Sequence, residues 1–187
     1  MPTSTYGSTK IAIEYFLNDI SKLDVIDIIS LRYFNPTGSH GDRVIYENIN
    51  NDPQNLMPRV VRVAMGKDNV IKIFGNDYKT ADGTAQRDYI HIEDLVNGHM
   101  KAIERIKFMK GYETFNLGTG SPVSVLELIV AFEKANKLKI NYEYYPRRPG
   151  DVEVCYADVS KAKDFLEWKT EKNIEEMCFD ALSPFKY

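Results

Sequence analysis

The sequence predicts an α/β protein built on a parallel sheet. Helical and extended patterns alternate along most of the chain, which is typical of that class. Residues 25–34 are almost continuously apolar, as expected of a strand that is covered on both faces of a parallel sheet. The chain has 187 residues, of which 43% are hydrophobic, so it is long enough to bury one large core or two small ones.

The expected elements follow one another in order along the chain. The first is a helix over residues 6–20, because four apolar residues recur there at helical spacing: Ile13, Phe16, Leu17 and Ile20. The strand at 25–34 comes next. The pattern then predicts a helix over 56–66 with Pro58 near its start, a strand over 70–74, an extended segment over 88–92, a helix over 93–106 and a strand over 114–117.

The last third of the chain continues the alternation. Ser124 and Glu127 form a Ser-x-x-Glu capping box, which predicts a helix that runs to about residue 136. Residues 140–145 are strand-like, and a final amphipathic helix is indicated by Ile174, Met177, Cys178 and Ala181. Residues 35–55 form a loop rich in Gly, Asn and Asp, much longer than the ~4–6 residues of ordinary connections. Because such loops are usually functional, we expect it at the mouth of the site.

Composition excludes several classes of function. There are 24 basic and 27 acidic residues with no long basic run, so we expect no nucleic-acid partner. Cys155 and Cys178 are too few for a disulfide framework and suit a reducing compartment, which predicts a cytoplasmic protein. No apolar stretch approaches the ~20 residues of a membrane helix. Residues 1–5 lack the features of a secretory signal.

Tyr6 and Lys10 stand four residues apart near the start of the first expected helix. At this spacing the ammonium lies beside the phenol. A tyrosine ordinarily titrates near ~10, so one that serves as a base at neutral pH needs its pKa lowered by roughly three units, about 4 kcal/mol, and a nearby cation acts in that direction. Both residues are also common on exposed helix surfaces. A Tyr-x-x-x-Lys pair is the acid/base unit of nicotinamide-dependent sugar and alcohol chemistry, yet nothing before Tyr6 could bind a nicotinamide, so the chain is expected to be the later half of an enzyme.

A glycine turn and two arginines give further signals. Gly118-Thr119-Gly120 follows a strand and precedes a capped helix, but the third glycine of a dinucleotide-binding turn is Val123 here, which favours a plain strand-to-helix turn. Arg87 and Arg148 stand beside turns, and guanidinium groups suit a diphosphate because they donate parallel hydrogen bonds. The two arginines are 61 residues apart, so only the fold could bring them together, and solvated surface arginines are the alternative.

Metal and hydrolase chemistry find no support in the sequence. The three histidines, His40, His91 and His99, are isolated, and neither His-x-x-x-His nor Cys-x-x-Cys occurs. The Gly-x-Ser-x-Gly turn of a serine hydrolase is absent as well. We therefore expect no metal and no Ser-His-Asp site.

Several short segments follow one another in a particular order: Tyr6-Gly7-Ser8-Thr9-Lys10, Leu31-Arg32-Tyr33-Phe34-Asn35-Pro36-Thr37-Gly38, Asn55-Leu56-Met57-Pro58, Phe74-Gly75-Asn76-Asp77-Tyr78, Asp82-Gly83-Thr84, Arg87-Asp88-Tyr89-Ile90-His91, Asn116-Leu117-Gly118-Thr119-Gly120 and Arg147-Arg148-Pro149-Gly150-Asp151. In this order they resemble the carboxy-terminal part of UDP-glucose 4-epimerases, a family of extended short-chain dehydrogenases. The resemblance runs from Tyr6 to at least Trp168. It implies an α/β fold with a truncated doubly wound, Rossmann-type parallel sheet remnant in residues 1–35, and a smaller α/β sugar-nucleotide domain in 36–187, with 88–106 packing back on the cofactor domain.

The resemblance implies a redox-neutral reaction, the NAD-dependent epimerisation of a UDP-hexose at C4. Tyr6 matches the base that takes the proton from the 4-hydroxyl while hydride passes to NAD. Lys10 matches the residue that holds the nicotinamide ribose and makes the tyrosine more acidic, and Phe34 matches a position beside the nicotinamide. A 4-keto sugar forms, turns over in the pocket and accepts the hydride on its other face. UDP-glucose and UDP-galactose are the implied substrates.

The resemblance also implies a set of substrate-binding residues: Asn35, Asn55, Lys72, Ile73, Phe74, Arg87, Arg148, Asp151 and Cys155. Among them, Asn55 lies close to the diphosphate, Arg87 and Arg148 clamp it, residues 72–74 contact the uridine, and Asp151 binds the uridine ribose. Cys155 falls beside the sugar 2-position. A small side chain there leaves room for an N-acetyl group, which gives the hypothesis that N-acetylhexosamines are also substrates.

Three departures from the family pattern bear on function. The amino-terminal half, with its glycine-rich turn, adenosine-binding acid and catalytic Ser or Thr, has no counterpart in this sequence. Tyr46-Glu47-Asn48-Ile49 replaces the usual Gly-Glu-Asp-Pro, and Pro149 replaces a common glutamate. We therefore expect the isolated chain to be inactive and the full-length protein to be a homodimer. The alternatives are a truncated homologue that binds UDP-sugars or a partner without catalysis, and, among enzymes, a UDP-sugar decarboxylase or nucleotide-sugar dehydratase.

Overall fold

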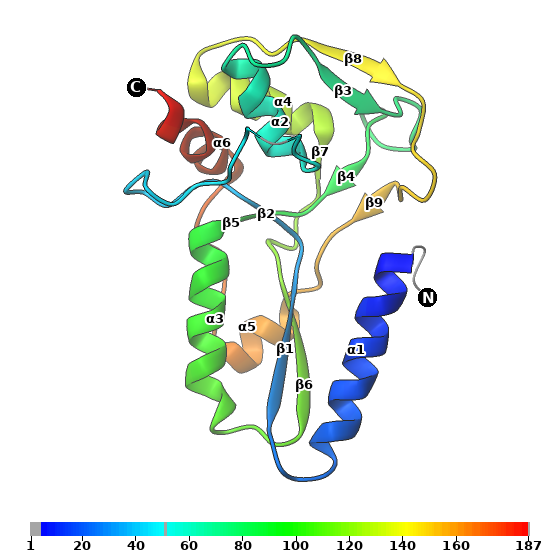
Figure 1. The fold of residues 1–187 in the computed structure, drawn as a ribbon, viewed down its shortest axis with the longest axis vertical. Coiled ribbons are helices and arrows are strands. Elements are labelled where there is room, and N and C mark those ends of the chain that lie inside the picture. Colours follow the sequence, from blue (N-terminus) through cyan, green and yellow to red (C-terminus); the bar gives the residue numbers. More distant parts are fainter. Residues whose placement is uncertain (1–4, 51, 187) are drawn as a thin grey trace.

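The computed structural model describes residues 5–50 and 52–186, which form an elongated α/β arrangement (Figure 1). One half of the molecule contains the long strands β1 and β6 flanked by helices α1, α3 and α5, and the other contains α2, α4 and α6. The helices are α1 Thr5–Ser21, α2 Leu56–Ala64, α3 Ile92–Ile106, α4 Val125–Asn136, α5 Ser160–Leu166, α6 Ile174–Leu182 and the short 3-10 helix η1 Ser183–Phe185.

The strands form small sheets, most of whose pairings are parallel. They are β1 Ile28–Tyr33, β2 Asn35–Thr37, β3 Ile71–Phe74, β4 Gln86–Arg87, β5 Tyr89–His91, β6 Tyr112–Leu117, β7 Val123–Ser124, β8 Tyr142–Tyr145 and β9 Val154–Cys155. β1 pairs with β6, β2 with β5 and β3 with β8, all in parallel, while β4 pairs in parallel with β9 and antiparallel with β7. The parallel class predicted from the sequence is confirmed.

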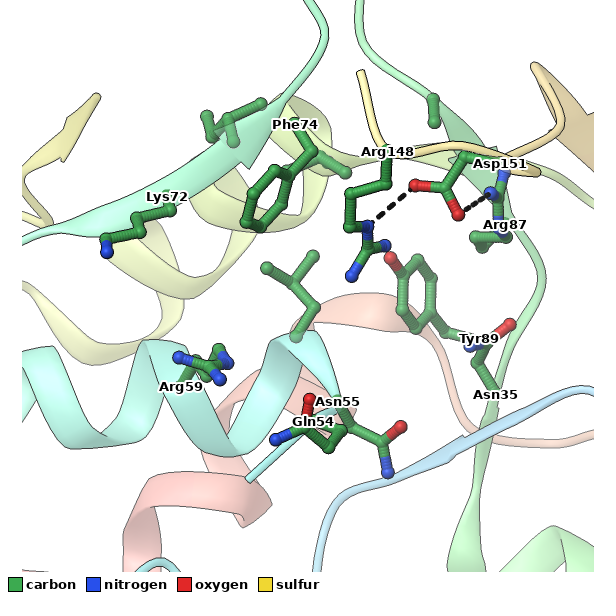
Figure 2. Close-up of a pocket in the computed structure, with 14 residues that line it drawn as sticks. Asn35, Gln54, Asn55, Arg59, Lys72, Phe74, Arg87, Tyr89, Arg148 and Asp151 are labelled. Atoms are coloured by element: carbon green, nitrogen blue, oxygen red, sulfur yellow. Dashed lines mark hydrogen bonds and ion pairs between the residues drawn. The ribbon is translucent and has the colours of Figure 1, made fainter. Parts of the chain in front are cut away.

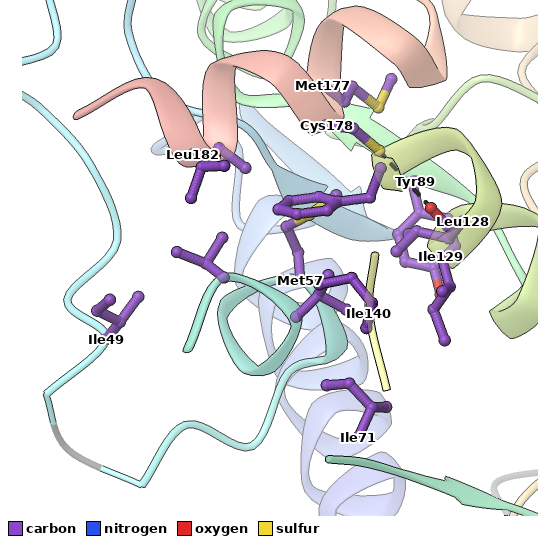
Figure 3. Close-up of a cluster of buried hydrophobic side chains, with 14 of the residues drawn as sticks. Ile49, Met57, Ile71, Tyr89, Leu128, Ile129, Ile140, Met177, Cys178 and Leu182 are labelled. Atoms are coloured by element: carbon purple, nitrogen blue, oxygen red, sulfur yellow. Dashed lines mark hydrogen bonds between the residues drawn. The ribbon is translucent and has the colours of Figure 1, made fainter. Parts of the chain in front are cut away.

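Two clusters of buried apolar side chains hold the chain together. The larger cluster joins α2, β3, α4 and α6 and includes the fully buried Leu128 and Phe132 (Figure 3). The smaller cluster lies around β6 and includes Phe115, Leu117 and Trp168. Burial of each such side chain contributes roughly 1.5–3 kcal/mol. The smaller cluster draws on residues 90–95, 115–117 and 162–168, so segments beyond residue 106 also pack beside β1. The division at residue 35 stays a prediction.

Most elements lie where the sequence predicts them. The helices at 6–20, 56–66 and 93–106 are confirmed, as is the capping box of α4, in which Glu127 N–H donates to Ser124 Oγ at 2.9 Å and Ser124 N–H to Glu127 Oε2 at 2.7 Å. Helix α5 has no counterpart among the expectations. Its seven residues are too few to present a clear apolar period.

The strand predicted over 25–34 is wrong at both ends and in its burial. Val25 and Ile26 precede β1 and are 75% and 53% exposed, and the extended chain divides into β1 and β2 at Phe34. β1 itself is only partly buried, and Tyr33 is exposed. Within the described residues β1 has one neighbouring strand, so its apolar sequence is not covered as a central strand would be.

Candidate functional site

A pocket of about 200 Å³ opens where α2, β2, β3 and β4 meet (Figure 2). The predicted substrate positions that line it come from five separate stretches of the chain. They are Asn35, Asn55, Lys72, Ile73, Phe74, Arg87, Arg148 and Asp151. The pocket therefore gathers every residue of the predicted substrate set except Cys155.

Backbone pairing explains how these residues reach one place. Asn35 begins β2, stands in register with Tyr89 of β5, and its N–H donates to the Asp88 carbonyl at 2.9 Å. Asn55 immediately precedes α2 and Phe74 ends β3. Helix α2 and strand β3 contribute side chains to the larger cluster, and β2 is paired with β5, which contributes Tyr89 to it.

Two guanidinium groups converge on one carboxylate. Arg148 Nε donates to Asp151 Oδ2 at 2.8 Å, and Arg87 Nη2 lies 4.0 Å from Asp151 Oδ1. Arg87 Nη1 also donates to the carbonyl oxygens of Gln86 and Val152, both at 2.8 Å, which holds its side chain in place. Two cations share one anion here, so the end of the pocket carries an excess of positive charge that suits an anionic ligand.

Aromatic side chains line the space between the two ends of the pocket. The guanidinium carbon of Arg148 lies 4.8 Å from the centre of the Phe74 ring, a cation–π contact. Lys72 Nζ lies 5.1 Å from the Tyr145 ring, and its side chain points away from Asp151 (Figure 2). Phe74 thus separates the arginine end from the lysine end and offers a flat face for a planar group.

Several lining residues escaped the sequence analysis: Gln54, Leu56, Arg59, Ala85, Tyr89 and Val125. Tyr89 is 5% exposed, and burial raises the pKa of its hydroxyl. Its position two residues after Arg87 in an extended segment places both side chains on the same face, which is a signal that could have found it. Gln54 and Leu56 flank Asn55, whereas Arg59 lies one helical turn further on.

The glycine turn at 118–120 is a plain turn, as the sequence favoured. The buried Asp88 carboxylate accepts hydrogen bonds from Thr119 N at 2.8 Å, Gly120 N at 2.9 Å and Ala157 N at 3.1 Å, and one from Thr119 Oγ1 at 2.7 Å. The amide donors that a phosphate would need are therefore occupied by a side chain of the same protein.

The three residues predicted on the cofactor side do not line the pocket. Lys10 Nζ lies 5.1 Å from the centre of the Tyr6 ring, so the pair is adjacent, and Tyr6 is 71% exposed at the amino end of α1. In Figure 1 this end of α1 is turned toward the half that contains β4 and β9. Phe34 lies between β1 and β2, where its N–H donates to the Leu117 carbonyl at 3.2 Å. Cys155 is exposed and stands in register with Arg87.

The loop over 35–55 reaches the pocket only with its two ends. Asn35 and Asn55 line the pocket, while Val44 in the middle of the loop is 75% exposed and outside it. The loop contacts α3 instead, where Gly41 N–H donates to Glu93 Oε1 at 3.0 Å. The middle of the loop therefore does not line this pocket, although Glu47 reaches the Asn55 side chain. The expectation of a loop at the mouth of the site stays a prediction.

Residues 5–50 and 52–186 contain no group of three or more His, Cys, Asp or Glu placed to hold a metal ion. None of the helices in this part of the chain combines the length and apolar character needed to cross a membrane.

Comparison with known proteins identifies the family of this chain. The model of the NAD dependent epimerase/dehydratase family matches residues 1–118. The chain is 47% identical over 180 residues to the UDP-glucose 4-epimerase of Bacillus subtilis and 46% identical over 181 residues to that of Drosophila melanogaster. These matches cover 96% and 95% of this chain but 53% and 52% of the relatives, so the chain spans about half the length of the curated relatives it matches.

Solved structures give the same result. The UDP-glucose 4-epimerase of Bifidobacterium longum in complex with NAD+ and UDP superposes with a TM-score of 0.92 at 44% identity, covering 97% of this chain and 54% of that one. The enzyme from Stenotrophomonas maltophila, with bound NAD and formylated UDP-arabinopyranose, gives 0.91 at 40% identity, covering 95% and 53%. The family model covers more than half of the sequence, and the fold agrees with it. The chain belongs to the NAD dependent epimerase/dehydratase family.

Proposed function

We propose that the pocket binds the uridine diphosphate part of a UDP-hexose. The observation that carries the proposal is the convergence of Arg87 and Arg148 on Asp151 at one end of a pocket lined by Phe74. A diphosphate matches the two guanidinium groups in charge and in hydrogen-bonding geometry. The relative from Bifidobacterium longum, whose fold this chain shares, was crystallised with UDP.

Each part of the nucleotide finds a chemically suitable group in this proposal. Arg87 and Arg148 hold the diphosphate, with the Asn55 amide as a further donor. Asp151 accepts hydrogen bonds from the ribose hydroxyls, and the strand end at 72–74 faces the uracil. Anchoring the nucleotide firmly leaves the hexose free to turn, which an epimerase requires, because binding energy is then spent away from the reacting ring.

In a protein of the family's full length, the proposed reaction is C4 epimerisation of a UDP-hexose. Bound NAD would supply the hydride acceptor. The described residues fit one end of that cofactor only: Tyr6 and Lys10 are adjacent and accessible, whereas the turn at 118–120 does not fit a pyrophosphate because Asp88 occupies its donors. Tyr6 would move the proton of the sugar 4-hydroxyl, and Lys10 would stabilise the phenolate.

The chain by itself is proposed to bind UDP but neither to bind NAD nor to turn over UDP-hexoses. Isothermal titration calorimetry of the 187-residue chain with UDP and with NAD tests this directly. UDP binding without NAD binding is expected. Arg148→Ala should weaken UDP binding roughly tenfold to a hundredfold, the equivalent of one charged hydrogen bond.

Arg147→Ala is the matched control for that variant. Arg147 carries the same charge one residue away, but its guanidinium pairs with Asp77 and lies 4.0 Å from the Tyr78 ring, outside the pocket. Absence of UDP binding, or an equal loss in both variants, contradicts the proposal.

Catalysis is tested in a chimera that joins this chain to the amino-terminal half of the Bacillus subtilis relative. UDP-galactose epimerisation is expected, and Tyr6→Phe should lower turnover by about a hundredfold or more, because the base is lost. An active Tyr6→Phe chimera contradicts the role of the phenol.

In the same chimera, Cys155→Tyr should reduce turnover of the N-acetyl sugar more than that of UDP-galactose. A homodimer in the cytoplasm remains part of the proposal for the full-length protein.

A further inference from the structure

The Asn55 side chain does not cap helix α2, although it stands at the N-cap position. It is the N-cap residue of α2, where asparagine ordinarily accepts a hydrogen bond from the second or third helical N–H, yet it makes no capping hydrogen bond. Asn173 and Ser124, the N-cap residues of α6 and α4, both form complete capping boxes. The difference has a cause in the sequence: the third helical residue of α2 is Pro58, which has no N–H to donate.

Asn55 instead contacts an acidic residue of the long loop. Its Nδ2 donates to Glu47 Oε1 at 3.4 Å. A carboxylate can only accept, so this contact selects the amide nitrogen, rather than the amide oxygen, as the atom beside Glu47. That nitrogen carries two hydrogens, and the one not taken by Glu47 is available to an anion in the pocket that Asn55 lines.

Contacts of residues on either side of Glu47 in the sequence fix the backbone around it. The preceding Tyr46 ring packs edge-on against the Phe185 ring, with the two centres 5.0 Å apart. Two residues later Ile49 is buried, and its carbonyl accepts a hydrogen bond of 2.7 Å from Arg62 Nη1. The carboxylate is therefore placed by the backbone before any ligand arrives, although the loop around it is exposed.

We propose that Glu47 is a positioning residue, which orients the Asn55 amide so that its second N–H points at the diphosphate of the bound nucleotide. The inference rests on the proposed UDP site. A carboxylate near a diphosphate repels it, so by charge alone the removal of Glu47 would tighten UDP binding. If Glu47 positions Asn55, its removal weakens UDP binding instead. The direction of the change in UDP affinity therefore separates the two explanations.

The test is titration calorimetry of the 187-residue chain with UDP and with uridine. Glu47→Ala should weaken UDP binding roughly fivefold to tenfold, comparable to the loss of one well-placed hydrogen bond. Uridine, which lacks the diphosphate, should bind as before. Glu47→Gln should stay within about twofold of the unchanged chain, because its amide oxygen still accepts from Asn55. In an Asn55→Ala background, Glu47→Ala should have no further effect.

Asp42→Asn is the matched control, since it removes the same charge from the same loop at a residue that pairs with His40, and it should leave UDP affinity unchanged. Undiminished or tighter UDP binding by Glu47→Ala overturns the role of Glu47 but leaves the proposed UDP site standing. An equal loss for uridine, or additive losses in the double variant, also overturns it. Absence of UDP binding by the unchanged chain overturns the proposed function and this inference with it.

Discussion

At the scale of single residues, the buried carboxylate of Asp88 is the clearest organising group. It accepts four hydrogen bonds from residues 31 to 69 positions away along the chain, at Thr119, Gly120 and Ala157. Gly118 completes this arrangement: a Cβ there would lie 2.5 Å from Asp88 Oδ2 and 2.7 Å from Ala157 Cβ. One carboxylate, between β4 and β5, thus holds the turn after β6 and the segment before α5.

Asp88→Ala is expected to lower the free energy of unfolding by about 3 kcal/mol, because three backbone donors lose the buried carboxylate that accepts their hydrogen bonds. Gly118→Ala should cost roughly 1–3 kcal/mol, since the new methyl group overlaps Asp88. Urea unfolding monitored by circular dichroism measures both. Ser121→Ala, at an exposed neighbouring position, is the control and should be neutral. A stability loss in the control as large as in Gly118→Ala would contradict the steric explanation.

A second contact between single residues makes the stability of the fold depend on pH. Arg62 donates from Nε to Asp68 Oδ2 at 2.6 Å and from Nη2 to Asp68 Oδ1 at 2.8 Å, and these hydrogen bonds hold the pKa of Asp68 below its ordinary value of 3.8. Because the folded-state pKa is depressed, this stabilisation is present above the ordinary value and is lost as pH falls through the folded-state pKa.

We expect the free energy of unfolding to decline as pH falls below about 4, with a smaller decline in Asp68→Asn, which has no carboxyl to protonate. Urea titrations of both proteins at a series of pH values measure the difference. Parallel curves for the two proteins over the acidic range would show that this pair contributes nothing to the pH dependence.

At the scale of elements, α1 is attached to the molecule more weakly than any helix of the larger cluster. Of its residues only Ser21 is buried, whereas α4 buries Leu128, Ile129 and Phe132. Its main polar tie to the sheet is the ion pair between Glu14 and Arg32 of β1, in which Arg32 Nε donates to Glu14 Oε1 at 2.6 Å. The helix that carries Tyr6 and Lys10 is therefore the one least restrained by packing.

Hydrogen exchange followed by mass spectrometry should show α1 amides exchanging faster than α4 amides, since local opening is easiest where few apolar contacts are broken. Glu14→Gln is expected to accelerate exchange in α1 and leave α4 unchanged. Asp19→Asn is the control, because Asp19 pairs with Lys22, the residue that follows α1, and not with a residue of the sheet. Equal effects of both variants would contradict a role for the Glu14 contact.

At the scale of the whole molecule, α1 and the segment after it expose several large apolar side chains. Tyr15 and Phe16 are 69% and 65% exposed, and Leu23 and Val25 after the helix are 70% and 75% exposed. The sheet beside them has two strands within the described residues, so each has an unpaired edge. Exposed apolar patches and unpaired strand edges both favour association.

The 187-residue chain is therefore expected to self-associate reversibly. Light scattering coupled to size-exclusion chromatography should report an apparent mass that rises with concentration, and Phe16→Glu should reduce that rise without changing the circular dichroism spectrum. Tyr142→Glu, at an exposed tyrosine on β8, is the control. A monomer at every concentration would contradict the expectation.

Local features could be predicted from the sequence, because they depend on residues a few positions apart. The helices follow from apolar periodicity, the α4 cap from Ser124 and Glu127, and the adjacency of Tyr6 and Lys10 from their spacing of four. The resemblance to the family also gave eight of the residues that line the pocket. Helix α5 and the true limits of β1 escaped prediction, since both are decided by contacts with distant segments.

The tertiary structure alone decided which of these residues meet. Arg87 and Arg148 share Asp151 because β4 pairs with β9. Asn55 contacts Glu47 because Pro58 removes the third helical N–H as a capping partner and the buried Ile49 places the loop. The sequence by itself determined the local elements and the chemical inventory of the site. Packing determined the site, because convergence across dozens of residues depends on the burial of side chains that no local pattern specifies.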